Sequence, residues 1–391
     1  MKIGFLFNAQ DHHVPHSLPI ACTLSALYPK YSVSVVARSE PQLALCRSLA
    51  LLYPGNRLTF DLLHVPRLVR AAHTIFRSQK SLILWANRRL INGFDALVVP
   101  ERTSLHLKKM GVRHPIYIHS FHGAGGHDKV DDPRLAAFDL LLVPNAERLE
   151  RIAAAGNARP GHAVVVGYSK FDLIKRLEAS RPPLFANDRP VIMYNPHHRK
   201  GTTSWSEMGP AILDHFARRD DYNLIFAPHI RLFDPPQRHA DAFRRWQGLE
   251  HIHIDLGSPA SVDMSYVAAA DIYLGDISSQ VLETLGRPRP CIFLNPHKLA
   301  WRNDPSFVYW RLGPVVEDLA GLDLALAKRA EWARDYEPKQ RAAFEKAFPS
   351  LPLPAPVAAA RAIDTLLREG HVTDEPQDKH SRKRGSGSCA G

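Results

Sequence analysis

The stretch DIYLGDISSQVLETLGRPRPCIFLN, residues 271–295, contains the pattern that decides the fold. An apolar run ends at Asp276, a helix start follows at Ser278 and Ser279, and a second apolar run begins at Cys291. Two such runs joined by a helix predict a β/α/β unit with parallel strands. Serine caps helix starts, where free N–H groups and the positive dipole end attract anions. The stretch therefore predicts a parallel sheet with an anion site, although Asp276 and Ser278 would also be typical of simple caps.

The same alternation extends outward through both halves of the chain. Expected strands are KIGFLFN, SVSVVA, DALVVP, PIYIHS and DLLLVP in the first half, and VIMYNP, NLIFAP, HIHIDLG, DIYLGD and CIFLNP in the second. Helices are expected over 18–27 and 42–52, and the proline-rich segment 181–190 interrupts the pattern. We therefore predict an α/β protein of two Rossmann-like domains facing one another across a cleft, with ligands at the carboxyl ends of the strands.

The predicted domains cover residues 1–180 and 190–350. A helix over 351–370 follows, and by analogy with other two-domain proteins it is expected to cross back to the first domain. Residues 371–391 end in KHSRKRGSGSCAG, a basic segment rich in Gly and Ser, which predicts a disordered tail.

Composition narrows the class of protein. A chain of 391 residues with 45% hydrophobic residues is long enough for two cores. It contains no run of 18 apolar residues and no signal peptide, so we expect a cytoplasmic location. The four cysteines lie far apart, which favours neither a zinc site nor disulfides. The net charge of +11 favours an anionic partner, and the absence of nucleic-acid-binding motifs argues against nucleic acid.

Three further polar clusters follow expected strands: HSFHGAGGHDK (119–129), NPHHRKGTTSW (195–205) and FAPHIRL (226–232). In the first, His122 could exchange a proton and Gly123 allows close backbone approach to a ligand. In the second, Arg199 is the expected anion contact, and the adjacent histidines favour a phosphate-facing loop over a metal site. A glycine loop with an exposed histidine, a solvated basic turn and an ordinary loop histidine remain the alternatives.

Five motifs then occur in one order between about residues 117 and 297. FHGAGGHDK is similar to W-H-G-x-P-L-K, GYSKFD to G-Y-P-R-N-D, YNPHHR to A-P-T-x-R, PHI to H-P, and GDISSQVLE to T-D-Y-S-S with an acidic residue four positions on. In these motifs the chain resembles the CDP-glycerol glycerophosphotransferase family of teichoic-acid and capsule polymerases, which has a GT-B fold. The shared residues are His122, Gly123, Lys129, Gly167, Tyr168, Lys170, Asp172, Pro196, Arg199, His229, Asp276, Ser278, Ser279 and Glu283. Phe121, His197 and Ile230 depart from the pattern, and the P-L pair of the first motif is missing.

The resemblance implies transfer of glycerol phosphate, or a related polyol phosphate, from a CDP-activated donor to a hydroxyl of a lipid-linked or polymeric acceptor. His122 would be the general base and His229 would lie on the donor phosphates. The first domain would bind the acceptor and the second the nucleotide. The nucleotide-binding and phosphate-binding residues would be Gly123, Arg199, Asp276, Ser278, Ser279 and Glu283, the last through the ribose hydroxyls. No metal or cofactor is expected, since no carboxylate cluster follows a strand.

Three alternatives stay open. A GT-B glycosyltransferase would use a UDP-sugar and attack carbon instead of phosphorus. A nucleotide-sugar epimerase would need acid and base carboxylates near His122, for which Asp128 and Asp131 are candidates. A degenerate relative would bind nucleotide without turnover. Residues 66–91 also combine Lys and Arg with large apolar residues, which indicates either a helix lying on an anionic membrane or a helix packed on the first sheet.

Overall fold

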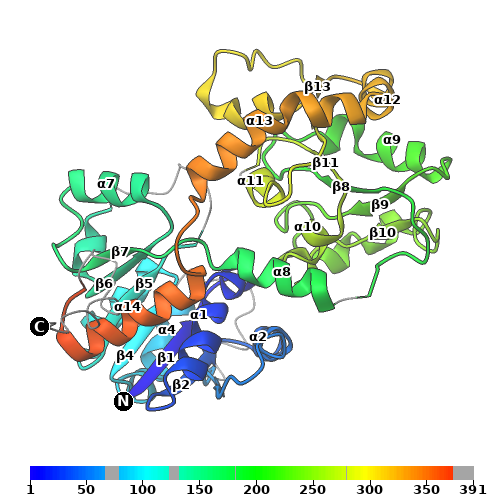
Figure 1. Ribbon diagram of the computed structural model, residues 1–391. Helices are drawn as coiled ribbons and strands as arrows, with labels where there is room; N and C mark the ends of the chain where they lie inside the picture. Colours follow the sequence, from blue (N-terminus) through cyan, green and yellow to red (C-terminus); the bar gives the residue numbers. More distant parts are fainter. Residues whose placement is uncertain (67–78, 123–131, 181, 279, 373–391) are drawn as a thin grey trace, which may run out of the picture.

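The protein consists of two α/β domains, each built around one parallel sheet (Figure 1). The computed structural model describes residues 1–66, 79–122, 132–180, 182–278 and 280–372. Every strand pair in both sheets is parallel. The predicted fold class of two Rossmann-like domains is thus confirmed.

The N-terminal sheet has seven strands in the order β3-β2-β1-β4-β5-β6-β7. The strands are β1 (Lys2–Phe7), β2 (Ser32–Ala37), β3 (Thr59–Leu62), β4 (Ala96–Val99), β5 (Ile116–Ser120), β6 (Leu140–Val143) and β7 (Ala163–Val165). The helices are α1 (Val14–Leu27), α2 (Glu40–Ala50), α4 (Gln79–Ala86), α5 (Arg88–Ile91), α6 (His106–Lys109) and α7 (Ala146–Ala154). Strand β1 lies at the centre and is covered on both faces, which is why its sequence is continuously apolar instead of alternating.

The C-terminal sheet has six strands in the order β10-β9-β8-β11-β12-β13. The strands are β8 (Val191–Asn195), β9 (Asn223–Phe226), β10 (Ile252–Ile254), β11 (Ile272–Gly275), β12 (Cys291–Leu294) and β13 (Val315–Val316). The helices are α9 (Trp205–Ala217), α10 (Ser265–Ala269), α11 (Gln280–Thr284), α12 (Leu319–Ala327) and α13 (Arg329–Ala347). The stretch 271–295 therefore forms the unit β11-α11-β12 at the middle of this sheet, as its pattern predicts.

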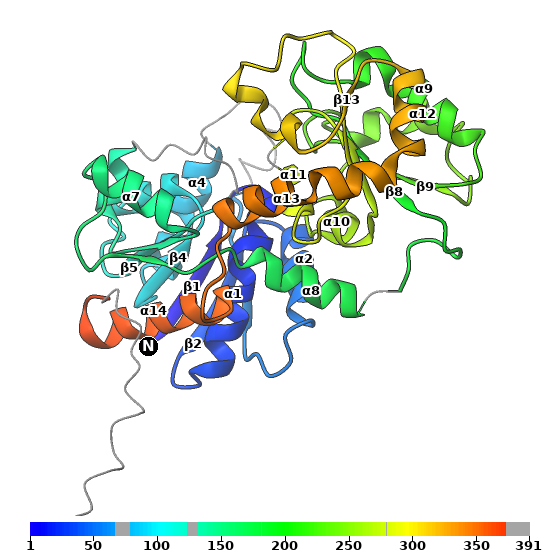
Figure 2. The ribbon, with the colours of Figure 1, turned by 45° about the horizontal axis from the view of Figure 1, so that its top comes forward.

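The chain passes between the domains twice. Helix α8 (Lys170–Ser180) lies between them and packs on both α1 and α10 (Figure 2). Helix α14 (Ala355–Glu369) leaves the C-terminal domain and packs along α1, burying Ala359, Ala360 and Ile363 completely. Asp364 fixes this docking, because it accepts hydrogen bonds from Tyr31 Oη at 2.8 Å and pairs with Lys30 Nζ at 2.6 Å.

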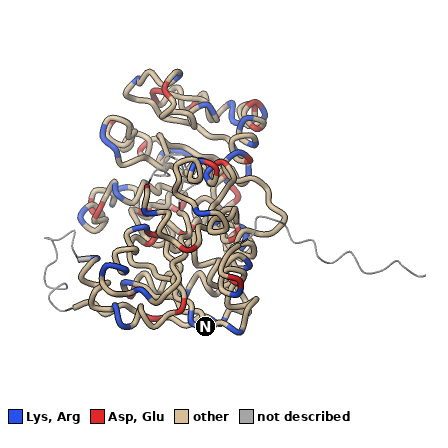
Figure 3. Tube along the Cα trace, turned by 90° about the vertical axis from the view of Figure 1, so that its left-hand side faces the viewer, with Lys and Arg blue, Asp and Glu red and all other residues tan. Residues whose placement is uncertain are grey.

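A single buried apolar cluster continues through both domains and includes Phe5, Tyr168, Phe293, Phe348 and Ile363. Apolar burial is the main stabilising term in folding, so this shared cluster couples the stability of the two sheets. Lys and Arg residues occur along the Cα trace of both domains instead of gathering in one stripe (Figure 3).

The structure adds strands that the pattern did not predict, namely β3, β7 and β13, all of which lie at or near sheet edges and have two to four residues. Most of the predicted tail, residues 373–391, and residues 67–78 of the amphipathic segment lie outside the described residues. Val372 is buried and donates its N–H to Gly161 O at 2.9 Å. Among the described helices, none is long and apolar enough to cross a membrane.

Candidate functional site

Polar side chains gather at the point in each sheet where the strand order reverses. In the N-terminal sheet this point lies between β1 and β4, and in the C-terminal sheet between β8 and β11. Open parallel sheets bind ligands at such points, because the loops after the two strands diverge and leave a crevice. His12 and His13 follow β1, and His197 and His198 follow β8. Each switch point therefore presents a pair of adjacent histidines.

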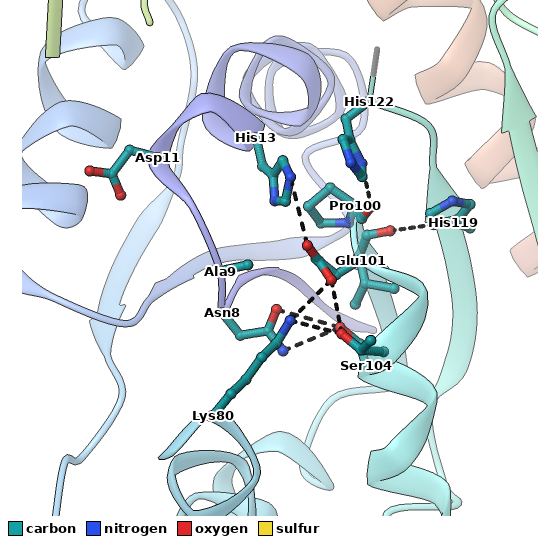
Figure 4. Close-up of polar contacts among 12 residues, drawn as sticks. Asn8, Ala9, Asp11, His13, Lys80, Pro100, Glu101, Ser104, His119 and His122 are labelled. Atoms are coloured by element: carbon teal, nitrogen blue, oxygen red, sulfur yellow. Dashed lines mark hydrogen bonds and ion pairs between the residues drawn. The ribbon is translucent and has the colours of Figure 1, made fainter. Parts of the chain in front are cut away.

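His122 lies two residues after β5 and joins the first histidine pair. Its ring centroid lies 4.0 Å from that of His13 and 6.2 Å from that of His12. Its Nδ1 lies 2.7 Å from Pro100 O, the carbonyl that follows β4 (Figure 4). A carbonyl only accepts, so Nδ1 carries the proton and the lone pair of the neutral ring is on Nε2. His122 is thereby held in the tautomer that a general base acting through Nε2 requires.

A partly buried carboxylate lies beneath these rings. Glu101 Oε1 is 3.7 Å from His13 Nε2, while Oε2 accepts hydrogen bonds from Lys80 Nζ at 3.0 Å and Thr103 Oγ1 at 2.8 Å (Figure 4). His13 is only 2% exposed, and burial lowers its pKa far below the ordinary value. The ring is therefore neutral, and Glu101 faces the edge of the ring without neutralising a charge on it.

The C-terminal switch point carries a second histidine trio. The ring of His229, which follows β9, lies 4.2 Å from His198 and 5.2 Å from His197. The backbone N–H of Arg231 donates to His229 Nδ1, and that of Arg199 donates to His197 Nδ1, both at 3.2 Å. Since Nδ1 accepts in both rings, the proton of each neutral ring is on Nε2. His197 and His229 therefore present N–H donors, which is the opposite of His122.

The two trios lie close to one another across the domain boundary. Burial, together with His122 and the positive charges of Lys170 and Arg231, lowers the pKa of His12 to about 4. Burial also lowers the pKa of His229 to about 3, with contributions from its neighbours His198 and His197, from Arg231 and from His12 of the other domain. Such mutual influence requires the N-terminal and C-terminal loops to lie close together. The rings of His12, His13, His197 and His229 are therefore neutral at physiological pH, with the charged groups Lys170 and Arg231 beside them.

Asp276 lies below the second trio instead of lining it. It is fully buried, and its Oδ2 accepts the backbone N–H of His197 at 2.8 Å and of Ser204 at 2.9 Å. Burial raises the pKa of Asp276 to about 6. Its carboxylate thus fixes the loop between β8 and α9 that carries His197. Ser278 Oγ accepts the N–H of Gln280 at 3.2 Å and caps α11.

Glu283 joins the two domains. It is 7% exposed, and its carboxylate accepts from Tyr168 Oη at 2.5 Å and from Lys170 Nζ at 2.9 and 3.0 Å. The GYSKFD motif and the final acidic residue of GDISSQVLE, more than a hundred positions apart, therefore meet in one buried cluster. A buried pair of this kind is costly to break, because removing one partner leaves an uncompensated charge.

The remaining predicted residues divide into two groups. Arg199 is exposed on the loop after β8. Gly123 and Ser279, with Asp128, Lys129 and Asp131, lie outside the described residues.

Sequence reasoning overlooked His12, His13 and His16, although the run DHHVPH directly follows the central strand β1. A histidine-rich run at the carboxyl end of the central strand was the signal that could have identified them.

A cavity lined by α8, residues 286–289 and residues 348–355 shares Tyr168 and Glu283 with the buried cluster described above. Its volume is about 510 Å³ and it contains Phe171, Phe344 and Phe348 but no histidine. It lies where the chain crosses between domains, so its shape depends on the crossing segments and not on the strand ends.

The sequence profile of the family described as CDP-Glycerol:Poly(glycerophosphate) glycerophosphotransferase matches residues 66–351, well over half of the chain. The chain belongs to this family. The match includes His122, His229, Asp276 and Glu283, and the predicted family membership is confirmed. No curated protein sequence matches the chain.

Solved structures with the same fold include other members of this architecture. The wall teichoic acid polymerase TagF is 16% identical, with a TM-score of 0.61 over 95% of this chain and 88% of TagF. A histidine-to-asparagine variant of TagF with CDPG matches equally well, at 16% identity and a TM-score of 0.61 over 94% of this chain and 88% of TagF. The UDP-GlcNAc 2-epimerase of Neisseria meningitidis, bound to UDP-GlcNAc, is 12% identical, with a TM-score of 0.57 over 94% of this chain and all of that one. At these identities the likeness shows the GT-B fold alone.

Proposed function

We propose that this member of the glycerophosphotransferase family transfers glycerol phosphate from CDP-glycerol to an acceptor hydroxyl during synthesis of a teichoic-acid-like or capsular polymer. The observation that carries the proposal is the opposite protonation of the two histidine trios. His122 has its lone pair on Nε2, whereas His197 and His229 have their protons on Nε2. A phosphoryl transfer needs both: a base for the attacking hydroxyl and donors for the phosphate oxygens.

In the proposed reaction the acceptor oxygen attacks the phosphorus that carries the glycerol, and its proton passes to His122 Nε2. The bond between that phosphorus and the bridging oxygen of CMP breaks, and CMP leaves. His229 Nε2–H donates to the phosphate oxygens on which negative charge develops. Positioning and electrostatic stabilisation contribute most of the rate enhancement in such transfers, so little covalent work falls to the protein.

Nucleotide binding is proposed for the C-terminal domain. Arg199 is exposed on the loop that Asp276 fixes, so its guanidinium can reach a donor phosphate. Ser278, Ser279 and Gly123 keep their proposed phosphate roles. Glu283 is proposed to accept the ribose hydroxyls, and in the present arrangement Lys170 and Tyr168 occupy its carboxylate. Donor binding would then require Glu283 to share or exchange these partners.

The experiment that tests the reaction measures CMP release from CDP-glycerol with a glycerol-phosphate primer as acceptor. His122→Ala should lower kcat by about 100-fold or more while nucleotide affinity stays unchanged, because general bases contribute about 10²–10⁴-fold. His229→Asn keeps a hydrogen-bond donor at this position and should retain more activity than His229→Ala. Turnover of UDP-sugars in preference to CDP-glycerol would instead support the glycosyltransferase alternative. Nucleotide binding without any turnover would support a degenerate relative.

We also propose that the protein acts on the cytoplasmic face of an anionic membrane, where a lipid-linked acceptor is held. Helices α4 and α5 present Leu82, Trp85 and Leu90 to solvent at 48%, 53% and 44% exposure. Arg88 lies over the Trp85 ring, 4.2 Å from its centroid. Exposed aromatic and aliphatic side chains beside arginines are typical of interfacial helices.

The same segment also packs inward, since Leu84 is 2% exposed and Lys80 is paired with Glu101. Packing of Leu84 in the interior accounts for the formation of the helix. It does not account for the large apolar side chains on the exposed face. Flotation with anionic liposomes tests the proposal. Trp85→Ser should weaken co-flotation, whereas Leu51→Ser, which alters an 84% exposed residue elsewhere on the same domain, should not. Equal flotation of both variants, or none by the native protein, would refute it.

A further inference from the structure

The first histidine trio has the composition of a metal site. The candidate ligand nitrogens of His12, His13 and His122 all lie within 4.8 Å of one another. Tetrahedral zinc with Zn–N bonds of about 2.0–2.1 Å spaces its nitrogens roughly 3.4 Å apart, so the widest pair exceeds that spacing by at most about 1.4 Å. Three imidazoles leave one coordination position open, as in catalytic zinc sites.

Two of the three rings in the first trio contain a buried nitrogen atom that makes no hydrogen bond. Among the described residues, Nδ1 of His12 and Nδ1 of His13 are buried without a hydrogen-bond partner. Nearly all buried polar atoms in folded proteins have a partner, so two orphaned nitrogens on adjacent rings call for a missing ligand. A bound cation would satisfy both of them together.

The surroundings also orient the rings as metal sites do. Ligating histidines generally direct their second nitrogen at a carboxylate or a backbone carbonyl. His122 Nδ1 lies 2.7 Å from Pro100 O, and His13 Nε2 lies 3.7 Å from Glu101 Oε1. The hydrogen bond to Pro100 O places the proton of His122 on Nδ1 and its lone pair on Nε2, whereas His13 Nε2 lies beyond hydrogen-bond distance of Glu101.

The second trio lacks this arrangement. His197 and His229 use their Nδ1 lone pairs to accept backbone N–H groups, so their Nε2 atoms carry protons and cannot ligate a metal in that tautomer. The two trios therefore differ in degree: among the described residues, the first contains two buried Nδ1 atoms without a hydrogen-bond partner, and the second contains one, that of His198. From this difference we propose that His12, His13 and His122 bind one divalent transition-metal ion of the zinc class, with its open position toward the cleft.

Nearby charged side chains influence the affinity of the first trio for a cation. Glu101 favours a cation at this point, whereas Lys170 and Arg231 act on His12 and oppose it. An ion bound here would occupy the His122 lone pair, so metal binding and the proposed base role of His122 exclude one another at any one time.

The test is a binding measurement on the untagged, metal-free full chain. Zn²⁺ is titrated against a chromophoric chelator, and Co²⁺ is added separately to record the visible spectrum of tetrahedral coordination. The native protein should bind one equivalent. His12→Ala and His13→Ala should each weaken binding by more than the 10–100-fold typical of an outer-shell partner, and Glu101→Gln by about 10-fold.

His198→Ala, from the second trio, is the matched control and should keep native affinity. Glu101→Gln retains all three ligands and serves where a histidine variant does not fold. Unchanged zinc binding in both His12→Ala and His13→Ala would overturn the proposal, as would loss of binding in His198→Ala. Because no turnover is measured, failure here leaves the transferase proposal to its own assay.

Discussion

Acid should unfold this protein through its buried histidines. His13, His16 and His119 are 2%, 6% and 2% exposed, and burial lowers the pKa of each, to about 3 for His119. A lowered folded pKa means that the unfolded chain takes up the proton first as the pH falls. The stabilising contribution is complete above pH about 6.5 and is lost below it.

The magnitude follows from linkage. Between pH 7.5 and 5.5 each such histidine costs about 1.4 kcal/mol, so the three together cost about 4 kcal/mol, a large part of a typical stability of about 5–15 kcal/mol. Asp276 acts in the opposite direction, because burial raises its pKa to about 6 and the folded state gains about 1 kcal/mol on protonating it. A net loss of about 3 kcal/mol is therefore expected from these four groups.

Urea unfolding at pH 7.5, 6.5 and 5.5, followed by near-UV circular dichroism, measures this loss. His119→Gln should reduce the pH-dependent loss by about 1.4 kcal/mol, whatever its effect on stability at pH 7.5. The ring packs between Phe121 and Phe138 and donates to Val99 O, so comparing slopes separates titration from packing. His106→Gln, at an exposed position, is the control. An unchanged slope in His119→Gln would refute the reasoning.

Three further outcomes are expected. Lys170→Met should lower stability by about 3–5 kcal/mol because it leaves Glu283 buried without its ion-pair partner, and the double variant Lys170→Met/Glu283→Gln should regain part of that loss in thermal unfolding. Ile363→Ala should cost about 2–5 kcal/mol by opening a cavity between α14 and α1, measured by urea unfolding. Asp276→Ala removes the acceptor of two backbone N–H groups and should weaken CMP binding in calorimetry while leaving zinc binding at the first trio intact.

Much of the fold follows from local pattern. Strands such as β1 and β11 are buried on both faces, so their sequences are continuously apolar and end abruptly at a polar residue. Helix α2 begins at Glu40, two residues before the predicted start. The side chain of Ser39 caps this helix by accepting the N–H of Gln42. The short edge strands β3 and β13 escaped prediction because few residues and partial exposure give them no distinctive pattern.

The site was predictable only in part. Strand ends point to the loops with His122, His229 and Asp276, because all carboxyl ends of a parallel sheet lie at one edge. No local pattern shows that Glu283 pairs with Lys170, since that contact depends on how the domains meet. Likewise, no local pattern shows that His12 and His122, which are 110 positions apart, lie next to one another in the fold.

The tautomers depend on contacts from outside the motifs. His122 has its lone pair on Nε2 because the chain after β4 places Pro100 O against Nδ1. His229 presents a proton because the backbone turns so that Arg231 N–H meets its Nδ1. Identical side chains thus obtain opposite roles from a carbonyl on one side and an amide on the other.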